Sequence, residues 1–134
     1  MALMYLLDTN ICIYIINRRP SYVREKLLSM QPSSVCLSAI SVGELEYGAF
    51  KSNKPARNIE AIRKFTVPFD ILHFDDRDAE MFGLIRADLE RRGCVIGPYD
   101  MQIAAQALAR NIVLVTNNTK EFERIPGLKL ENWA

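Results

Sequence analysis

The stretch YLLDTNICIYII, residues 5–16, places a single carboxylate, Asp8, inside a nearly apolar run. Burying an unpaired charge is costly, so Asp8 needs a role. Aspartate caps helix N-termini well and also starts turns. The third alternative is a chemical site that uses negative charge at the end of a rigid strand.

Residues 4–7 form a short, continuous apolar run, which is typical of a strand buried on both faces. The residues after Asp8 predict a helix that Pro20 ends. Further strands are predicted at residues 35–38, 69–74, 112–116 and 128–130, and the 69–74 segment alternates as expected nearer a sheet edge. Helical patterns lie between them, at residues 22–30, 41–52, from Pro55 onward, at 76–93 and at 101–111.

Strands that alternate with helices indicate right-handed βαβ units and a parallel sheet. We therefore predict an α/β fold, a three-layer α/β/α sandwich around a central, mainly parallel sheet. No repeat, linker or low-complexity segment divides the chain, so residues 1–134 are expected to form a single domain.

The composition limits the classes of partner. Charged residues make up 25% of the 134 residues and leave a net charge of +1, so an RNA or membrane surface has to be met by a local patch. The three cysteines, Cys12, Cys36 and Cys94, lie in or beside apolar stretches and are expected to be buried free thiols of a reducing compartment. No leader or membrane-spanning segment is visible, so the expected location is the cytoplasm.

Several polar residues fall where parallel strands end, which is where open α/β sheets bind ligands. Asp8 ends the first strand, Glu44 lies one short turn past the second, and Asn117–Asn118 follow the fourth. Asp100 begins the helix that leads into the fourth strand. Together these residues predict a cluster of carboxylates at one edge of the sheet.

Each of these residues also has an ordinary structural explanation. Glu44 fits a capping box with Ser41, Asp100 fits a helix N-cap, and Asn117–Asn118 fit a turn. None of these explains why like charges gather at one edge, since they repel unless a cation compensates them. Hard oxygen ligands in this number suit Mg²⁺ or Mn²⁺.

Four segments in register carry a family resemblance: LLDTNICIYII, SAISVGELEYGA, GPYDMQIAAQA and VLVTNNTKEFERIPGL. Together they resemble a PIN domain of the VapC toxin family over essentially the whole chain. The resemblance implies a Mg²⁺- or Mn²⁺-dependent endoribonuclease with Asp8, Glu44 and Asp100 as its catalytic acidic core, of which Asp8 and Asp100 hold the metal. It also implies a VapB-type antitoxin, a homodimer and toxin–antitoxin hetero-oligomers. The segments around Asp8 and Thr116 resemble the group that cuts initiator tRNA in the anticodon loop.

The chain departs from the family pattern at the fourth acid. Many PIN domains have an acid two positions after a threonine that follows the last core strand, whereas this chain has Thr116-Asn117-Asn118. Asn118 and Glu121 are the two auxiliary candidates for that position, and the sequence leaves the choice between them open.

Other classes remain as alternatives. A phosphatase of the haloacid-dehalogenase type needs a second acid two positions after Asp8, where this chain has Asn10. A receiver domain needs an acid pair after the first strand and a phosphate-accepting aspartate after the third. Asp75 and Asp76 follow the third strand, but no acid pairs with Asp8. A non-catalytic RNA-binding module is the further alternative. A metal-free ribonuclease with paired histidines is disfavoured because His73 is the only histidine.

Substrate RNA would need cations and aromatic side chains near the acidic edge. The aromatic candidates are Tyr14, Tyr47 and Tyr99. The cationic candidates lie in loops or helix ends: Arg18, Arg19, Lys51, Lys54, Arg57, Lys120 and Arg124. An antitoxin tail is expected in a groove that leads to the acidic edge along the first helices.

Overall fold

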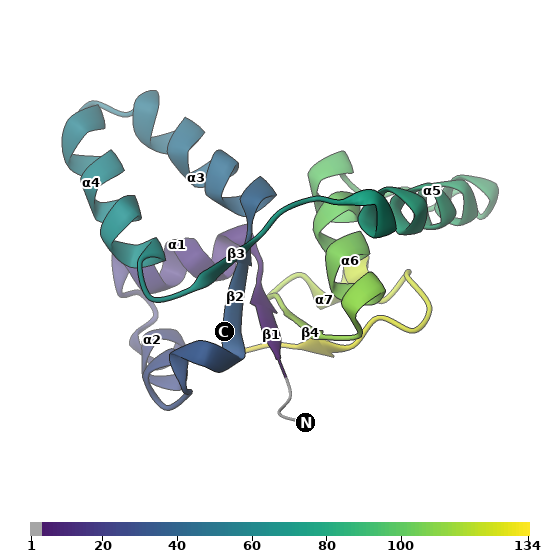
Figure 1. The fold of residues 1–134 in the computed structure, drawn as a ribbon, viewed down its shortest axis with the longest axis horizontal. Coiled ribbons are helices and arrows are strands. Elements are labelled where there is room, and N and C mark those ends of the chain that lie inside the picture. Colours follow the sequence, from purple (N-terminus) through teal and green to yellow (C-terminus); the bar gives the residue numbers. More distant parts are fainter. Residues whose placement is uncertain (1–3) are drawn as a thin grey trace.

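Five parallel strands form one central sheet in the order β3-β2-β1-β4-β5 (Figure 1). The computed structural model describes residues 4–134, so the first three residues of the predicted 1–134 domain lie outside it. The strand bounds are β1 Tyr5–Leu7, β2 Val35–Ser38, β3 Asp70–Leu72, β4 Val113–Val115 and β5 Leu130–Glu131. The parallel sheet and the edge position of the third strand are confirmed, whereas the last strand begins where the predicted segment 128–130 ends.

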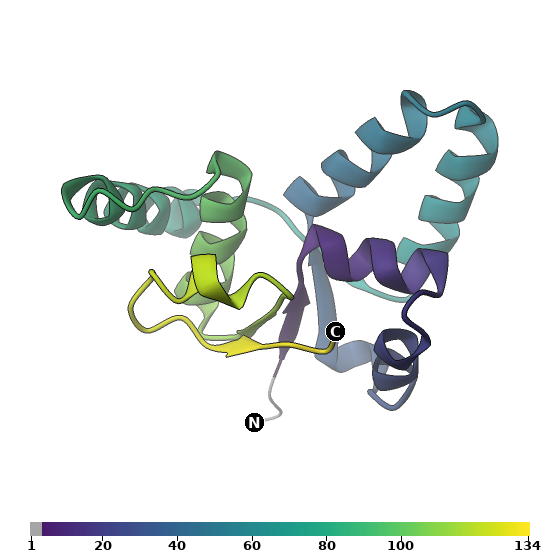
Figure 2. The same ribbon diagram turned by 180° about the vertical axis from the view of Figure 1, so that it is seen from behind.

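Helices cover both faces of the sheet. Helices α1 to α4 lie on one side, and α5, α6 and α7 lie on the other (Figures 1 and 2). Their bounds are α1 Thr9–Asn17, α2 Ser21–Leu28, α3 Ala39–Phe50, α4 Pro55–Thr66, α5 Asp76–Arg91, α6 Pro98–Arg110 and α7 Thr119–Phe122, with a 3₁₀ turn at Pro32–Ser34. The three-layer α/β/α sandwich is confirmed.

Alternate residues of the central strands supply the two cores. Leu6 and Leu114 pack with residues of α5, α6 and α7, whereas Leu7 and Val115 pack with residues of α1 to α4. All four side chains have no exposed surface. Burial on both faces explains why these strands are continuous apolar runs in the sequence.

The predicted starts of α3 and α6 are wrong. Helix α3 begins at Ala39, because the Ser38 hydroxyl caps it by accepting a hydrogen bond from the Ile40 N–H at 3.0 Å. The predicted capping box between Ser41 and Glu44 therefore does not form. Helix α6 begins at Pro98, a residue suited to a first turn, so Asp100 is its third residue and not its N-cap.

One predicted burial position is also wrong. Cys94 is only half-buried, although Cys12 and Cys36 are buried and all three thiols are free. No helix of residues 4–134 has the length and apolar character needed to span a membrane.

The last residues of the chain return to the first strand. Trp133 is 6% exposed, and its ring centroid lies 5.8 Å from that of Tyr5. Its indole N–H donates to Glu131 Oε1 at 2.8 Å. The C-terminal segment thus packs against β1 as well as extending the sheet.

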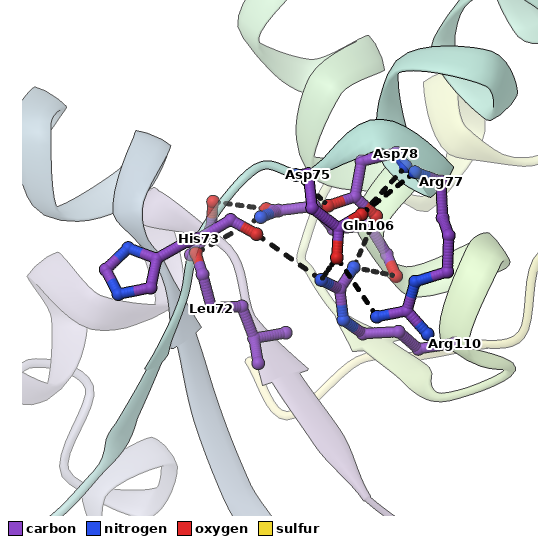
Figure 3. A network of polar contacts seen from close by, with 8 residues as sticks. Leu72, His73, Asp75, Arg77, Asp78, Gln106 and Arg110 are labelled. Atoms are coloured by element: carbon purple, nitrogen blue, oxygen red, sulfur yellow. Dashed lines mark hydrogen bonds and ion pairs between the residues drawn. The ribbon is translucent and has the colours of Figure 1, made fainter.

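A polar network fastens α6 to the sheet and to α5 (Figure 3). The Arg110 guanidinium forms an ion pair with Asp78, whose side chain has no exposed surface. It also donates to the backbone oxygens of Gln106 at 3.2 Å and His73 at 3.3 Å, and pairs with Asp75 at 3.4 Å. One cation therefore satisfies groups from α5, α6 and the segment after β3.

Gln106 extends this network under α3. Its side chain is fully buried, accepts a hydrogen bond from the Ser38 hydroxyl and donates to the Leu72 backbone oxygen at 3.2 Å. Ser38 is the last residue of β2 and caps α3, and Leu72 is the last residue of β3. Gln106 on α6 therefore links the ends of these two neighbouring strands. Helices α3 and α6, which carry Glu44 and Asp100, are held together by this contact.

Candidate active site

The strand order places Asp8 at the point where the chain changes direction across the sheet. β1 lies at the centre, with β2 on one side and β4 on the other, and ligand sites of open α/β folds form at such switch points. Asp8 follows β1 directly and is 6% exposed. The end of β1 thus presents a carboxylate at the expected position.

Asp8 also caps α1, so two of its alternative roles coincide. Its Oδ1 accepts a hydrogen bond from the Ile11 N–H at 2.9 Å, and its Oδ2 accepts one from the Thr116 hydroxyl at 2.5 Å. Burial raises the pKa of Asp8, the hydrogen bonds from Thr116 and Ile11 lower it, and the nearby charge of Glu44 raises it further. The balance is a raised pKa, because these two neutral donors do not replace the lost water.

Glu44 faces the start of α1 from α3. Its Oε1 lies 2.8 Å from the Thr9 hydroxyl, which is also 3.0 Å from the Ser41 hydroxyl. Thr9 follows Asp8 in the chain, so this contact brings the α3 carboxylate beside the end of β1. Glu44 and Asp8 are therefore brought together as the sequence predicts.

Asp100 approaches from the first turn of α6. Burial, followed by the charges of Asp8, Glu121 and Glu44, raises the pKa of Asp100 to about 6. The structure thus brings Asp100 into the electrostatic reach of three other carboxylates. Asp100 has no ion-pair partner in residues 4–134, and neither do Asp8, Glu44 and Glu121.

The two auxiliary candidates contact each other. The Asn118 side-chain amide donates to Glu121 Oε2 at 2.8 Å, and the Asn118 N–H donates to the Thr116 hydroxyl at 3.0 Å. Glu121 is the one whose charge acts on Asp100. Asn118 therefore hydrogen-bonds Glu121, and the charge of Glu121 reaches Asp100, so both candidates lie beside the acidic edge.

The donor chemistry fits a hard divalent cation. Four carboxylates share one region, and burial together with the charges of the other three raises the pKa of Asp100, since no ion pair compensates these acids in residues 4–134. In the described part of the chain, no three acidic, histidine or cysteine side chains are already gathered closely enough to hold a metal ion. The predicted ligand set therefore stays a prediction, with side chains that must draw together around an ion.

The sequence reasoning missed two hydroxyl groups. The Thr9 hydroxyl is hydrogen-bonded to Glu44. The Thr116 hydroxyl, which is fully buried, is hydrogen-bonded to the Asp8 carboxylate and to the Asn118 N–H. Their positions in the sequence could have indicated this role, because Thr9 is the residue after Asp8 and Thr116 is the first residue after β4. Both lie at the carboxyl edge of the sheet.

Other candidate residues lie away from the acids or are already engaged. His73 is exposed after β3, and Asp75, a candidate phosphate acceptor of a receiver domain, caps α5 and pairs with Arg77 and Arg110. The Arg124 guanidinium donates to the backbone oxygen of Val95 at 3.3 Å. Of the basic candidates, Arg124 is therefore bound to the loop between α5 and α6.

Comparison with known proteins agrees with this geometry. Residues 5–128 match the PIN domain family. The tRNA(fMet)-specific endonuclease VapC of Salmonella typhimurium is 44% identical over 132 residues, which is 98% of this chain and 99% of that protein. Ribonuclease VapC2 of Haemophilus influenzae is likewise 44% identical, with the same coverage of both chains.

A solved structure, that of DNA-bound VapBC from Salmonella typhimurium, superposes with a TM-score of 0.93 at 43% identity. The superposition covers 99% of this chain and 100% of that one. Sequence and fold therefore match end to end, and the acidic edge lies within the matched region. This chain belongs to the PIN-domain family and, within it, to the VapC ribonucleases.

Proposed function

We propose that this protein is the toxin of a type II toxin–antitoxin pair, a metal-dependent endoribonuclease that inhibits translation by cutting initiator tRNA in its anticodon loop. The observation that carries the proposal is the group of four uncompensated carboxylates at the switch point of the sheet. The relative from Salmonella typhimurium, named as specific for tRNA(fMet), supports the choice of substrate.

Asp8 and Asp100 are the residues that would hold Mg²⁺ or Mn²⁺, with Glu44 and Glu121 beside them. The bound ion would supply positive charge against the phosphate and the leaving oxygen. Thr116 and Ile11 fix the Asp8 carboxylate, and Thr9 fixes that of Glu44, so the acids are already oriented by hydrogen bonds. Glu44 would orient the attacking water or complete the ligand set.

The test is incubation of the purified protein with total tRNA in Mg²⁺, in Mn²⁺ and in excess EDTA, followed by mapping of the cut ends. We expect cuts in initiator tRNA with a metal and none with EDTA, because the site has no paired histidines. Hydrolysis by water leaves a 5′-phosphate and a 3′-hydroxyl. Undiminished cleavage in EDTA, with an Asp8→Asn preparation as the control for contaminating nuclease, would contradict the proposal.

A VapB-type antitoxin is the proposed partner, in the cytoplasm. A groove of about 330 Å³ between α1, α3 and α4 has an apolar lining that includes Ile13, Ile16, Leu45 and Ile62, and Glu44 lies at its margin. An amphipathic segment fits such a groove, and an arginine on it would meet the carboxylates. The solved relatives from Salmonella typhimurium and Rickettsia felis are VapBC proteins, which supports this choice.

Growth tests address the partner. Expression of the chain alone should arrest growth, and co-expression of its antitoxin should restore it. Normal growth at good levels of the lone protein would contradict the toxin proposal. Light scattering after size exclusion measures whether the lone chain is a homodimer and whether the pair forms a hetero-oligomer.

A further inference from the structure

A second hollow adjoins the groove described above. It lies between α1, α3 and the first turn of α6, and its volume is about 700 Å³. Glu44 and Thr9 line it, so it opens directly onto the acidic edge. Whatever occupies this hollow is next to the phosphate that the carboxylates act on.

Two tyrosines from different helices line this hollow. Tyr47 on α3 is 65% exposed and Tyr99 on α6 is 56% exposed. Tyr14, the third candidate in the sequence, accepts a hydrogen bond from the Asn117 amide at 2.7 Å and packs against the core of α1 to α4. The structure therefore leaves Tyr47 and Tyr99 as the aromatic rings available beside the acidic edge.

A cation lies at the far end of the same hollow. The Lys51 ammonium is 4.8 Å from the centroid of the Tyr47 ring, and Lys51 follows the last residue of α3. Glu44 and Lys51 are about 10 Å apart along the helix axis, at 1.5 Å per residue. The hollow thus runs from carboxylates, past aromatic rings, to a positive charge.

The wall formed by α3 includes two glycines, Gly43 and Gly48. A methyl group added to either would meet no atom within 4 Å. Glycine weakens a helix relative to alanine, so packing inside this chain gives no reason for either glycine. The absence of side chains at these two positions leaves the α3 wall of the hollow open to a flat ligand.

We propose that this hollow holds an unstacked base of the RNA, the base of the nucleotide next to the scissile phosphate. Tyr47 and Tyr99 supply the stacking surfaces, and Lys51 meets the neighbouring phosphate. This inference rests on the proposed ribonuclease function and adds to it the place where the substrate is recognised. We infer an RNA base as the occupant because aromatic rings and a cation lie next to the carboxylates that would cleave the phosphate.

The test combines protein variants with an altered substrate. The substrate is a synthetic stem-loop of tRNA(fMet) that spans the mapped cut. Two further stem-loops each carry one abasic ribose, the first on the 5′ side of the cut and the second on the 3′ side. Tyr47→Ala and Tyr99→Ala should lower kcat/KM on the intact stem-loop roughly 10- to 100-fold. On the stem-loop that lacks the stacked base, the same variants should cause little further loss, because the interaction is already absent. Tyr22→Ala, which removes a tyrosine that is 55% exposed on α2, is the matched control and should leave cleavage unchanged.

A second pair of variants excludes loss of folding as the explanation. Gly48→Ala narrows the hollow, whereas Gly83→Ala adds the same methyl group to α5, where it also meets no atom within 4 Å. Both changes should preserve or raise the melting temperature, because alanine favours a helix. Only Gly48→Ala should raise KM for the stem-loop.

The outcomes separate this inference from the function on which it rests. If the wild-type protein does not cut the stem-loop, the proposed function fails and the base site fails with it. If the wild type cuts and the tyrosine variants lose equal activity on intact and abasic RNA, the base site alone is overturned. Wild-type cleavage by Tyr47→Ala together with weakened binding of the antitoxin would assign the hollow to the protein partner instead.

Discussion

Two groups of carboxylates in this molecule have opposite surroundings. Asp75 and Asp78, at the start of α5, meet the guanidinium of Arg110, and Asp75 also meets Arg77 (Figure 3). Among residues 4–134, the acids Asp8, Glu44, Asp100 and Glu121 at the carboxyl edge of the sheet form no ion pair and meet neutral donors and one another.

The pKa values follow this difference. The hydrogen bond and charge of Arg77, with the charge of Arg110, lower the pKa of Asp75. Burial and neighbouring acids raise the pKa of Asp100 to about 6. The first group is charge-compensated within the chain, whereas the second has no ion pair in residues 4–134, which is typical of a ligand site.

Removal of the cation from the first group should produce the largest effect. Arg110→Met leaves the buried Asp78 carboxylate without an ion-pair partner, although it keeps its hydrogen bond from the Asp75 N–H, so the free energy of unfolding should fall by about 3–5 kcal/mol. Urea unfolding followed by circular dichroism measures this. Arg92→Met is the control, since its pair with Asp88 is exposed and is expected to contribute under about 1 kcal/mol. Equal losses in the two variants would refute the distinction between the two groups.

Asp100→Asn should affect cleavage strongly and folding little. The amide keeps the shape but removes a charge from the cation site, so tRNA cleavage should fall roughly 100-fold or more at low metal. The unfolding free energy of the metal-free protein should hold or rise, because one repelling charge is lost from the acidic edge. Cleavage across a Mn²⁺ titration is the measurement, with Asp76→Asn on α5 as the control. Wild-type cleavage at low Mn²⁺ would remove Asp100 from the site.

Glu121→Gln should have a smaller effect. Glu121 acts on Asp100 by its charge, and Asn118 orients it by a hydrogen bond. Cleavage should fall roughly 10-fold, in keeping with the loss of a residue that supports the metal ligands. Glu123→Gln, an exposed change two residues further on, is the control. If Asn118→Ala is damaging and Glu121→Gln is not, the fourth position belongs to Asn118.

The smallest expected effect is a difference in pH dependence. The pKa of Asp100 in the folded protein lies near 6, above its ordinary value of 3.8, so the folded state binds this proton more tightly than the unfolded state. The associated stability is present below about pH 4 and is lost as the pH rises through 6. Thermal unfolding of the metal-free wild type and of Asp100→Asn between pH 4 and 7.5 should show a larger loss in the wild type, because the variant keeps only the raised pKa of Asp8.

Cleavage should change with pH in the opposite direction. Protonated Asp100 is a poor metal ligand, so tRNA cleavage should decline below about pH 6. Identical slopes of stability against pH in the wild type and in Asp100→Asn would contradict the raised pKa.

The sequence predicts the sheet well because its central strands are buried on both faces. Leu6, Leu7, Leu114 and Val115 face two cores, and no polar residue interrupts their runs. The carboxylates that end β1 and follow β2 were predictable for the same reason, since the strand ends fix their edge. The family resemblance and the arrangement of the acids agree there.

The remaining details depend on contacts between distant segments. Ser38 and Ser41 are equally good helix caps in the sequence, and Ser38 caps α3. The hydrogen bond between Asn118 and Glu121 and the approach of Glu121 to Asp100 depend on how α7 is oriented relative to α6. The Arg110 network joins residues more than 30 positions apart, and no local pattern marks it.

The contact between Trp133 and Tyr5 gives the protein an optical reporter of its own. Trp133 is the only tryptophan of the chain, and it lies buried against the first residue of β1. Its fluorescence therefore reports whether the C-terminal segment is docked on the sheet, without any label. Because Asp8 follows the other end of β1, RNA and metal at the acidic edge can be titrated while this emission monitors the fold.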